Sequence, residues 1–470
     1  MSREKRLIKN SVIFAIGNFG SKAITFIMLP YYTYLLTTKQ YGEVEIIMST
    51  IALLVPIISV NLFEAAFRFA LDKENDNISI FSSALVTNLV LISLVLILYP
   101  LFIKLNIGGE YLFISLMLLF ISIIELLFKQ FSKAIDKINV YMYSDFVQVI
   151  VFVIGNIFFI GKCDLGVLGY IISKIIALMS DSLVLFWGAK LYKFIDIRKI
   201  DKQHIKDMIK FGVPLIPNSL MWWINNLLDR YIITYMLGLS SVGLYSFAAK
   251  FPSILATFNG VFINAWQISA IEEHNKVGID KFYSDIFNLF AVFLIVITSI
   301  LIIIIRPVIE IIISTSFISA WIYVPILFIA SIFSSFSSFL GVHYGVIKNT
   351  KGALKSTVVA AILNLVLNLI FIPILGIQGA GLATLISMIV LFLIRAYDIN
   401  KIIHINYDLK NFLISSIIII FQVLILFKVN NIYIMILIEL FNFFLILFVN
   451  QKYIKGLNMF FRRKLGVVKH

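Results

Sequence analysis

The chain has 470 residues, of which 61% are hydrophobic and only 14% are charged, and its mean hydropathy is +1.00. These values exceed ordinary globular usage and exclude a soluble domain, so we expect an integral membrane protein. The formal net charge of +14 fits a surface that faces anionic lipid, which we favour over nucleic-acid binding.

Apolar stretches of spanning length recur along the chain, since a transmembrane helix needs about 20 mostly apolar residues. The basic start MSREKRLIKN resembles a signal peptide, but its apolar run continues at spanning length without a small-residue cleavage site, so we expect a retained first helix. The pattern predicts an all-α protein with about fourteen spans, at residues 11–36, 43–70, 79–103, 111–135, 142–161, 165–189, 209–236, 241–270, 282–305, 317–347, 355–374, 377–397, 411–427 and 431–450.

The distribution of lysine and arginine predicts how the chain is oriented in the membrane, because short cytoplasmic loops carry an excess of both. Most lie in the loops on the side of the N-terminus, including the linker 190–210 and the inner end of the span 111–135. The opposite loops hold only Lys39, Lys104, Lys162, Arg306 and Lys428. Over an even number of spans, this asymmetry predicts that both termini are cytoplasmic.

Two segments of the sequence resemble segments that lie later in the chain. YLLTTKQYGEVEI at 34–46 resembles YMLGLSSVGLYSF at 235–247, and LGVLGYIISKIIALM at 165–179 resembles LGIQGAGLATLISMI at 375–389. Transporters are commonly built from such repeats, with the substrate site between them. We therefore predict two pseudo-symmetric six-helix lobes, at 1–200 and 201–400, followed by an appended helix pair and a basic tail at 401–470. The glycines of the second match favour close helix packing over a phosphate-binding loop, because no strand precedes them.

Three blocks of sequence carry a family resemblance: KNSVIFAIGNFGSKAITFIMLPYYTYLLTTKQYGEVE at 9–45, NLFEAAFRFAL at 61–71, and KFGVPLIPNSLMWWINNLLDRYIITYMLGLSSVGLYSFAAKFP at 210–252. They resemble the polysaccharide transporter (Wzx-type) repeat-unit flippases, in the superfamily that also holds the multidrug and toxin extrusion exporters. The resemblance implies the fold of these exporters, a MATE-like fold, and a flippase of the bacterial plasma (inner) membrane. Such a protein moves an undecaprenyl-pyrophosphate-linked oligosaccharide of O-antigen, capsule or exopolysaccharide synthesis to the outer leaflet by alternating access. Its partners are this lipid-linked oligosaccharide and membrane lipid, and a contact with other polysaccharide-assembly proteins stays open.

Five cations fall within the predicted spans, where a charge facing lipid is unfavourable. We expect them to reach the interface or to line a cavity that binds the pyrophosphate. Alternatives stay open for three of them: Arg68 could snorkel to the interface, Arg230 could pair with an acid on another helix, and Lys174 could share a polar seam with Asp181. The five cations are Lys22, Arg68, Lys174, Arg230 and Lys250.

Sugars need aromatic platforms and hydrogen-bonding side chains, and the chain offers Trp222, Trp223, Asn226, Trp266 and Gln267. Packing or interfacial anchoring is the alternative for each aromatic residue. No cofactor is expected, but coupling to protons or sodium would require a buried carboxylate. The candidates are Glu125, Asp229 and Glu64, and Glu64 also lies one helical turn before Arg68, where an ion pair is the alternative.

An enzyme is not expected. The predicted external loops are short, no nucleophile motif occurs, and the single cysteine and five histidines form no metal-spaced cluster, so we name no catalytic or metal-binding residue. A drug exporter and a peptidoglycan-precursor flippase of the same superfamily remain the rival functions.

Overall fold

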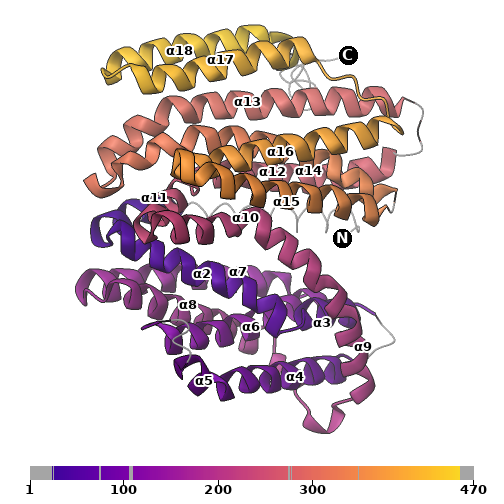
Figure 1. The fold of residues 1–470 in the computed structure, drawn as a ribbon. Helices are drawn as coiled ribbons and strands as arrows, with labels where there is room; N and C mark the ends of the chain where they lie inside the picture. Colours follow the sequence, from indigo (N-terminus) through magenta and orange to yellow (C-terminus); the bar gives the residue numbers. More distant parts are fainter. Residues whose placement is uncertain are drawn as a thin grey trace. The chain divides into compact units, whose positions relative to one another are not determined.

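The computed structural model describes residues 24, 26–72, 76–104, 109–273, 276, 278–347 and 349–455. In these residues the regular structure is helical (Figure 1), which confirms the predicted all-α class. The chain divides into two compact units, unit 1 at Met1–Tyr231 and unit 2 at Ile232–His470.

Unit 1 contains long helices joined by short turns. It begins with a helix at residues 26–35. There follow α2 (Thr38–Ile58), α3 (Leu62–Ala70), α4 (Asn77–Ile97), α5 (Tyr99–Lys104), α6 (Leu112–Ala134), α7 (Ile138–Asn156), the π-helix η1 (Ile157–Lys162), α8 (Gly166–Gly188), the 3-10 turns η2 (Leu191–Phe194) and η3 (Ile197–Lys199), α9 (Lys202–Gly212), η4 (Val213–Leu215) and most of α10 (Ile216–Leu237).

Unit 2 begins within α10 and is also helical. It continues with α11 (Leu239–Ala248), α12 (Ser253–Glu273), α13 (Ile279–Ile312), η5 (Thr315–Tyr323), α14 (Val324–Val346), α15 (Thr350–Leu375), α16 (Ile377–Asn400), α17 (Leu409–Lys428) and α18 (Ile432–Val449). The helices α17 and α18 pack on each other and on α13 (Figure 1).

Twelve helical segments among the described residues are long and apolar enough to cross a membrane. Each matches a predicted span, so the expected helix count roughly fits. The two remaining predictions are 11–36, which lies mainly outside the described residues, and 209–236, which contains α10. This helix is long enough but less apolar, because it carries Asn225, Asn226, Asp229 and Arg230. Two predicted spans are interrupted: 43–70 is α2 and α3, and 241–270 is α11 and α12.

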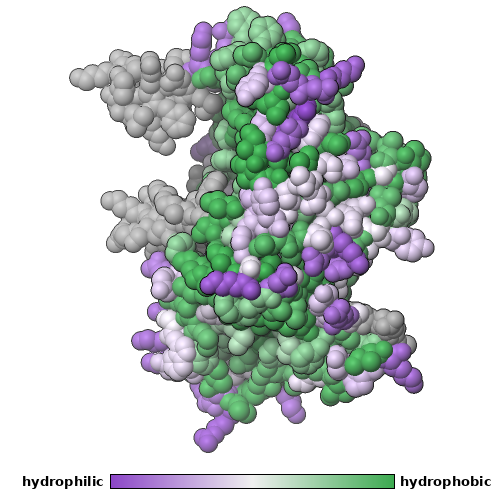
Figure 2. Space-filling view, turned by 90° about the vertical axis from the view of Figure 1, so that its left-hand side faces the viewer, coloured by the Kyte–Doolittle hydropathy of each residue, from purple (hydrophilic) through white to green (hydrophobic). Residues whose placement is uncertain are grey.

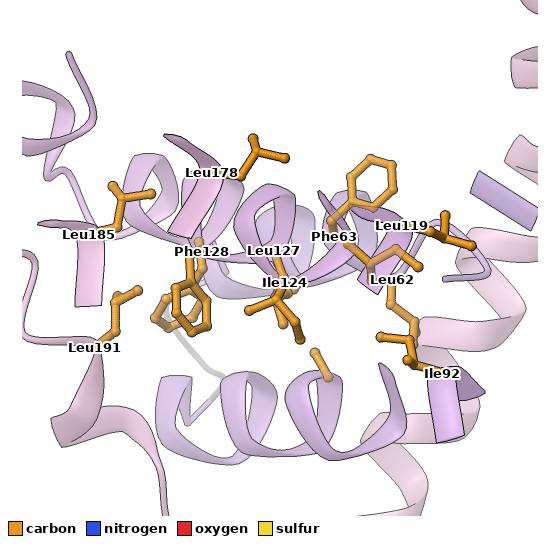
Figure 3. Close-up of a cluster of buried hydrophobic side chains, with 14 of the residues drawn as sticks. Leu62, Phe63, Ile92, Leu119, Ile124, Leu127, Phe128, Leu178, Leu185 and Leu191 are labelled. Atoms are coloured by element: carbon orange, nitrogen blue, oxygen red, sulfur yellow. The ribbon is translucent and has the colours of Figure 1, made fainter. Parts of the chain in front are cut away.

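The interior of unit 1 is a layer of aliphatic and aromatic side chains (Figure 3). Side chains of α3, α4, α6 and α8 contribute to it, among them Leu62, Ile92, Leu127 and Leu178. Hydrophobic side chains also cover much of the face shown in Figure 2. Inside a bilayer, exclusion of water cannot favour one apolar surface over another, so close packing must hold these helices together.

The linker at residues 190–210 is tied to the start of α4. The Ser82 hydroxyl donates to the Phe194 carbonyl oxygen (2.9 Å) and accepts from the Asp196 amide (2.9 Å). Lys199 donates to the Asp76 carboxylate, which precedes α4, at 2.9 Å, and this bond lowers the pKa of Asp76 below its ordinary value. The linker predicted as a basic loop is therefore a folded part of unit 1.

The second sequence match has a structural counterpart in two helical hairpins, α7–α8 and α15–α16. A Cβ atom added to Gly169 would lie 2.9 Å from the Phe159 carbonyl oxygen, and one added to Gly379 would lie 2.3 Å from the Phe371 carbonyl oxygen. In both hairpins, the absence of a side chain lets the second helix approach the backbone of the first. The lobe limits near residues 200 and 400 stay a prediction.

Gly379→Ala should destabilise unit 2, because the new methyl group would meet a backbone carbonyl that cannot rotate away. We expect a loss of about 1–3 kcal/mol, measured as a lower thermal unfolding temperature in detergent. Gly345→Ala is the matched control, because a Cβ there meets nothing within 4 Å. Equal unfolding temperatures for the two variants would contradict the close approach.

Candidate functional site

The break between α2 and α3 is the most irregular backbone within a predicted span of unit 1. Val60 and Asn61 have φ of 52° and 51°, in the left-handed region that non-glycine residues rarely adopt. Pro56 precedes the break, and a Cβ on Gly212 would lie only 2.0 Å from the Val60 carbonyl oxygen. Irregular backbone at membrane depth is tolerated where it is buried in protein or lines a cavity.

A pocket of about 570 Å³ lies at this break. The indole of Trp222, 59% exposed, forms part of its wall. Polar groups from three segments join it, namely Asn61 in the break, Glu64 on α3, and Asn218 and Ser219 on α10. The remaining lining residues are Ala52, Val55, Pro56, Phe63, Leu126 and Leu215.

Glu64 is held in this pocket by α6. Its carboxylate accepts a hydrogen bond from the Gln130 side-chain amide at 2.8 Å. The sequence suggested Arg68 as its partner, but the side chain of Arg68 is exposed and the bonded partner comes from another helix. A carboxylate fixed in this way can accept hydrogen bonds from a hydroxyl-rich ligand.

A charge cluster around Lys129 lies deeper in unit 1. The Lys129 ammonium nitrogen is 2.5 Å from Glu125 of α6, 2.6 Å from Asp145 of α7 and 2.7 Å from Asp181 of α8. It also donates to Gln148 at 3.1 Å. Asp181 is fully buried and Glu125 nearly so. One ammonium therefore joins three helices.

Lys174 of α8 belongs to the same environment. Its ammonium interacts electrostatically with Glu125, Asp145 and Asp181, and it lies 5.3 Å from the centre of the Phe152 ring. Lys174 and Asp181 thus share one space, as their spacing on α8 suggested. With both lysines charged and three carboxylates ionised, the cluster has one excess negative charge, which a bound proton would neutralise.

Lys129 is not among the site residues predicted from the sequence, because its place at the inner end of a predicted span groups it with the cytoplasmic basic residues. The structure places Lys129 within α6 and only 12% of its side chain is exposed. Its position four residues after Glu125 was the available signal, since such residues are neighbours on a helix. The contributions of Asp145 and Asp181 could not be read from local spacing.

Arg230 is buried where α10 meets α2. Its Nε lies 3.5 Å from the Glu45 carboxylate of α2, and its Nη1 donates to the Asn226 carbonyl oxygen at 2.8 Å. Asp229 accepts a hydrogen bond from the Arg230 backbone amide at 2.9 Å. The geometry present is therefore that of the predicted alternative, an ion pair with another helix. A role of Arg230 in cargo binding stays a prediction, as does ion coupling at Asp229.

Two aromatic residues strengthen this α2–α10 contact. The indole N–H of Trp223 donates to the Ser49 carbonyl oxygen at 2.8 Å, and Tyr231 forms a short hydroxyl contact with Thr50. Trp223 is buried, whereas its neighbour Trp222 points into the pocket. Of this adjacent pair, Trp222 is the one with an accessible ring.

The other predicted residues are dispersed. In unit 2, Trp266 is buried, stacks on Phe339 at 4.3 Å and donates to its carbonyl oxygen, whereas Gln267 is exposed on α12. Lys250 lies in the turn between α11 and α12. Asn226 is exposed on α10, and Lys22 lies outside the described residues. Sugar contact or cargo binding by any of them stays a prediction.

Comparison with protein families gives a match over more than half of the chain. The model of a family described as polysaccharide biosynthesis protein matches residues 7–267. A relative from Haemophilus influenzae, Lsg locus putative protein 1, is 23% identical over 291 residues, which are 59% of this chain and 66% of the relative. The chain thus spans slightly less than two thirds of that relative's length.

Solved structures share the fold. The lipid II flippase MurJ, in its inward closed conformation, aligns with a TM-score of 0.70 and 19% identity over 97% of this chain and 99% of that one. A multidrug resistance MATE family transporter of the MOP superfamily, in its inward-facing conformation, aligns with a TM-score of 0.65 and 16% identity over 81% and 95%. The MATE-like fold expected from the sequence is confirmed.

Lys129→Met should destabilise unit 1 strongly, because it removes the lysine paired with all three carboxylates and leaves them in an apolar interior with Lys174 alone. We expect a loss of about 3–5 kcal/mol, measured by thermal unfolding in detergent. Adding Asp181→Asn to this variant should restore part of the loss by removing one negative charge. The exposed Lys137, changed to Met, is the control and should be neutral. Wild-type stability in Lys129→Met would contradict a stabilising cluster.

Proposed function

Because the chain belongs to the polysaccharide biosynthesis protein family, we propose that it is the flippase for an undecaprenyl-pyrophosphate-linked oligosaccharide repeat unit. The cargo would serve O-antigen, capsule or exopolysaccharide synthesis and would move from the cytoplasmic to the outer leaflet of the bacterial plasma membrane. The family match over residues 7–267 carries this proposal. The protein is a multi-pass membrane transporter and not an enzyme.

The pocket at the α2–α3 break supports a glycan as cargo. A saccharide presents hydroxyl groups on its edges and C–H groups on its faces, so it needs hydrogen-bonding side chains beside an aromatic ring. Trp222 supplies the ring, and Glu64 and Asn218 supply an acceptor and an amide. We propose that this pocket contacts one sugar of the repeat unit.

The pyrophosphate requires positive charge, since it brings about two negative charges into a medium of low dielectric. Arg230 and Lys174 already interact with carboxylates. Arg68 is exposed on α3 one turn beyond Glu64, which places it on the same side of the helix as the pocket residue. We therefore favour Arg68 for the pyrophosphate, with Lys22 and Lys250 as further candidates.

Transport against a gradient would need an energy source, and the excess carboxylate of the Lys129 cluster is a candidate proton acceptor. Among the carboxylates named for ion coupling, Glu125 is the one that lies in this cluster.

We also propose that both termini are cytoplasmic, from the distribution of lysine and arginine, and that the chain forms two six-helix lobes with an appended helix pair. The rival functions are those of the fold neighbours, a lipid II flippase and a multidrug transporter.

Deletion of the gene should trap completed lipid-linked repeat units on the cytoplasmic leaflet and abolish the surface polysaccharide. The measurement is extraction of the isoprenoid-linked intermediates, mass spectrometry of their glycan, and an assay of their leaflet. A trapped peptidoglycan precursor would favour the first rival function. Drug sensitivity without any trapped intermediate would favour the second.

Trp222→Ala should slow flipping about tenfold, which corresponds to about 1.4 kcal/mol, because the sugar loses its aromatic platform. Trp222→Phe should retain most of the activity, because a flat ring remains. Trp187→Ala is the matched control, since Trp187 is an exposed indole of unit 1 that does not line the pocket. Equal flipping by the Trp222→Ala and Trp187→Ala proteins would exclude Trp222 from the cargo path.

A further inference from the structure

The C-terminal helices α17 and α18 contain a buried carboxyl group that the proposed cargo site does not use. Both helices pack on α13, beside one another (Figure 1). The outer side of α18 is strongly apolar, with Leu437, Phe441 and Phe444 all more than half exposed. Its buried side consists of Met435, Glu439, Asn442 and Ile446, at the spacing of one helical face.

Glu439 is 0% exposed and meets a carboxamide from the neighbouring helix. Gln422 of α17 is also fully buried and lies beside the Glu439 carboxyl group. Neither its side-chain nitrogen and oxygen nor the two Glu439 carboxyl oxygens have a hydrogen-bond partner among the described residues. Asn442, one turn further along α18, is 3% exposed. The helix pair therefore buries three polar side chains here, in addition to Ser415 and Asn450, which are joined by a hydrogen bond of 2.9 Å.

Among the described residues of α13 and α17, the helices that pack on α18, no charged side chain interacts with Glu439. Within residues 286–305 of α13, 411–427 of α17 and 429–451 of α18, Glu439 is the only acidic or basic residue. Tyr433, the remaining titratable group there, is 80% exposed. Beyond these ranges, Arg306 is held by Glu310 at 2.7 Å and by the Leu426 and Val429 carbonyl oxygens, and Lys428 ends α17.

The chemistry of this environment requires a neutral carboxyl group. An ionised carboxylate buried without a cation is strongly unfavourable, and such a group takes up a proton instead. A protonated carboxyl group has one O–H donor and one carbonyl acceptor, and a carboxamide offers the complementary pair. A small adjustment of the two side chains would let a protonated Glu439 donate to the Gln422 oxygen while the Gln422 N–H group donates back, which would satisfy polar atoms that have no partner in the structure.

We propose that Glu439, paired with Gln422, is a proton-binding site in the C-terminal helix pair, and that it exchanges its proton with water during the transport cycle. Binding moves one proton from water to a carboxylate oxygen, and release returns it. Release leaves a charge that only water can stabilise, so α17 and α18 must separate locally when the proton leaves. The second half of this proposal rests on the proposed flippase function, whereas the first does not.

The test of proton binding uses dicyclohexylcarbodiimide, which modifies protonated carboxyl groups in apolar surroundings. The full-length protein in proteoliposomes is treated over a series of buffers from alkaline to acidic, and adducts are located by peptide mass spectrometry. We expect an adduct at Glu439 that increases with acidity and is absent from Glu439→Gln. Glu310, which is paired with Arg306 at the end of α13, should stay unmodified.

Two results would overturn proton binding: no adduct at Glu439 in any buffer, or an adduct that sodium prevents and acidity does not increase. The second result would indicate a sodium site instead. Because labelling needs no cargo, it remains informative even if the wild-type protein flips no lipid-linked oligosaccharide and the proposed function fails.

The second half of the proposal, proton exchange during the transport cycle, is tested by measuring the flipping rate over the same series of buffers. We expect the rate of the wild-type protein to depend on pH and that of Glu439→Gln to lose this dependence, whereas Glu310→Gln should keep it. An unchanged pH profile in a stably folded Glu439→Gln protein would overturn proton exchange during transport and leave the proton-binding site in place.

Discussion

Lys129 carries a positive charge into the apolar interior of unit 1, and three carboxylates from α6, α7 and α8 surround it within 2.7 Å. In a medium of low dielectric, neither the ammonium nor the carboxylates could stay ionised alone. Their ion pairs, with Lys174 beside the same carboxylates, therefore fix how these three helices meet. The next residue of α6, Gln130, positions Glu64 in the pocket. The packing of α6, α7 and α8 thus depends on one buried charge cluster, and α6 also contributes to the candidate site.

Unit 2 buries a carboxyl group in a different way. Glu439 has a carboxamide beside it in place of a cation. Its burial is favourable only when the carboxyl group carries a proton, whereas the burial of an ionised Glu125 depends on its pairing with Lys129. A neutral hydrogen-bonded pair can be separated and rejoined as the proton leaves and returns, whereas a multiply paired ammonium holds its helices in one arrangement. The two units therefore suit different tasks, a fixed scaffold beside a glycan-sized pocket and a pair of helices whose contact can respond to protonation.

Much of the fold could be predicted from the sequence, because bilayer thickness sets the length of an apolar helix and composition reveals each one. Twelve predicted spans have helices that are long and apolar enough to cross a membrane among the described residues. The glycine-rich second repeat gives close helical hairpins at Gly169 and Gly379. The breaks after Ile58 and Ala248 were not predicted, because hydropathy is insensitive to a turn of a few apolar residues. At Val60, the break depends on the backbone of Gly212, about 150 residues away in sequence.

The sequence by itself determined that this is a helical membrane protein and identified its family, because apolar length, basic loops and local motifs are properties of contiguous residues. It also indicated Arg230 and Lys174 as charges that need partners. Only the tertiary structure decided who those partners are: Glu45 for Arg230, and the carboxylates around Lys129 for Lys174. Hydrophobic periodicity places a side chain on a face of its helix, but the neutralisation of a buried charge depends on which distant helix packs against that face.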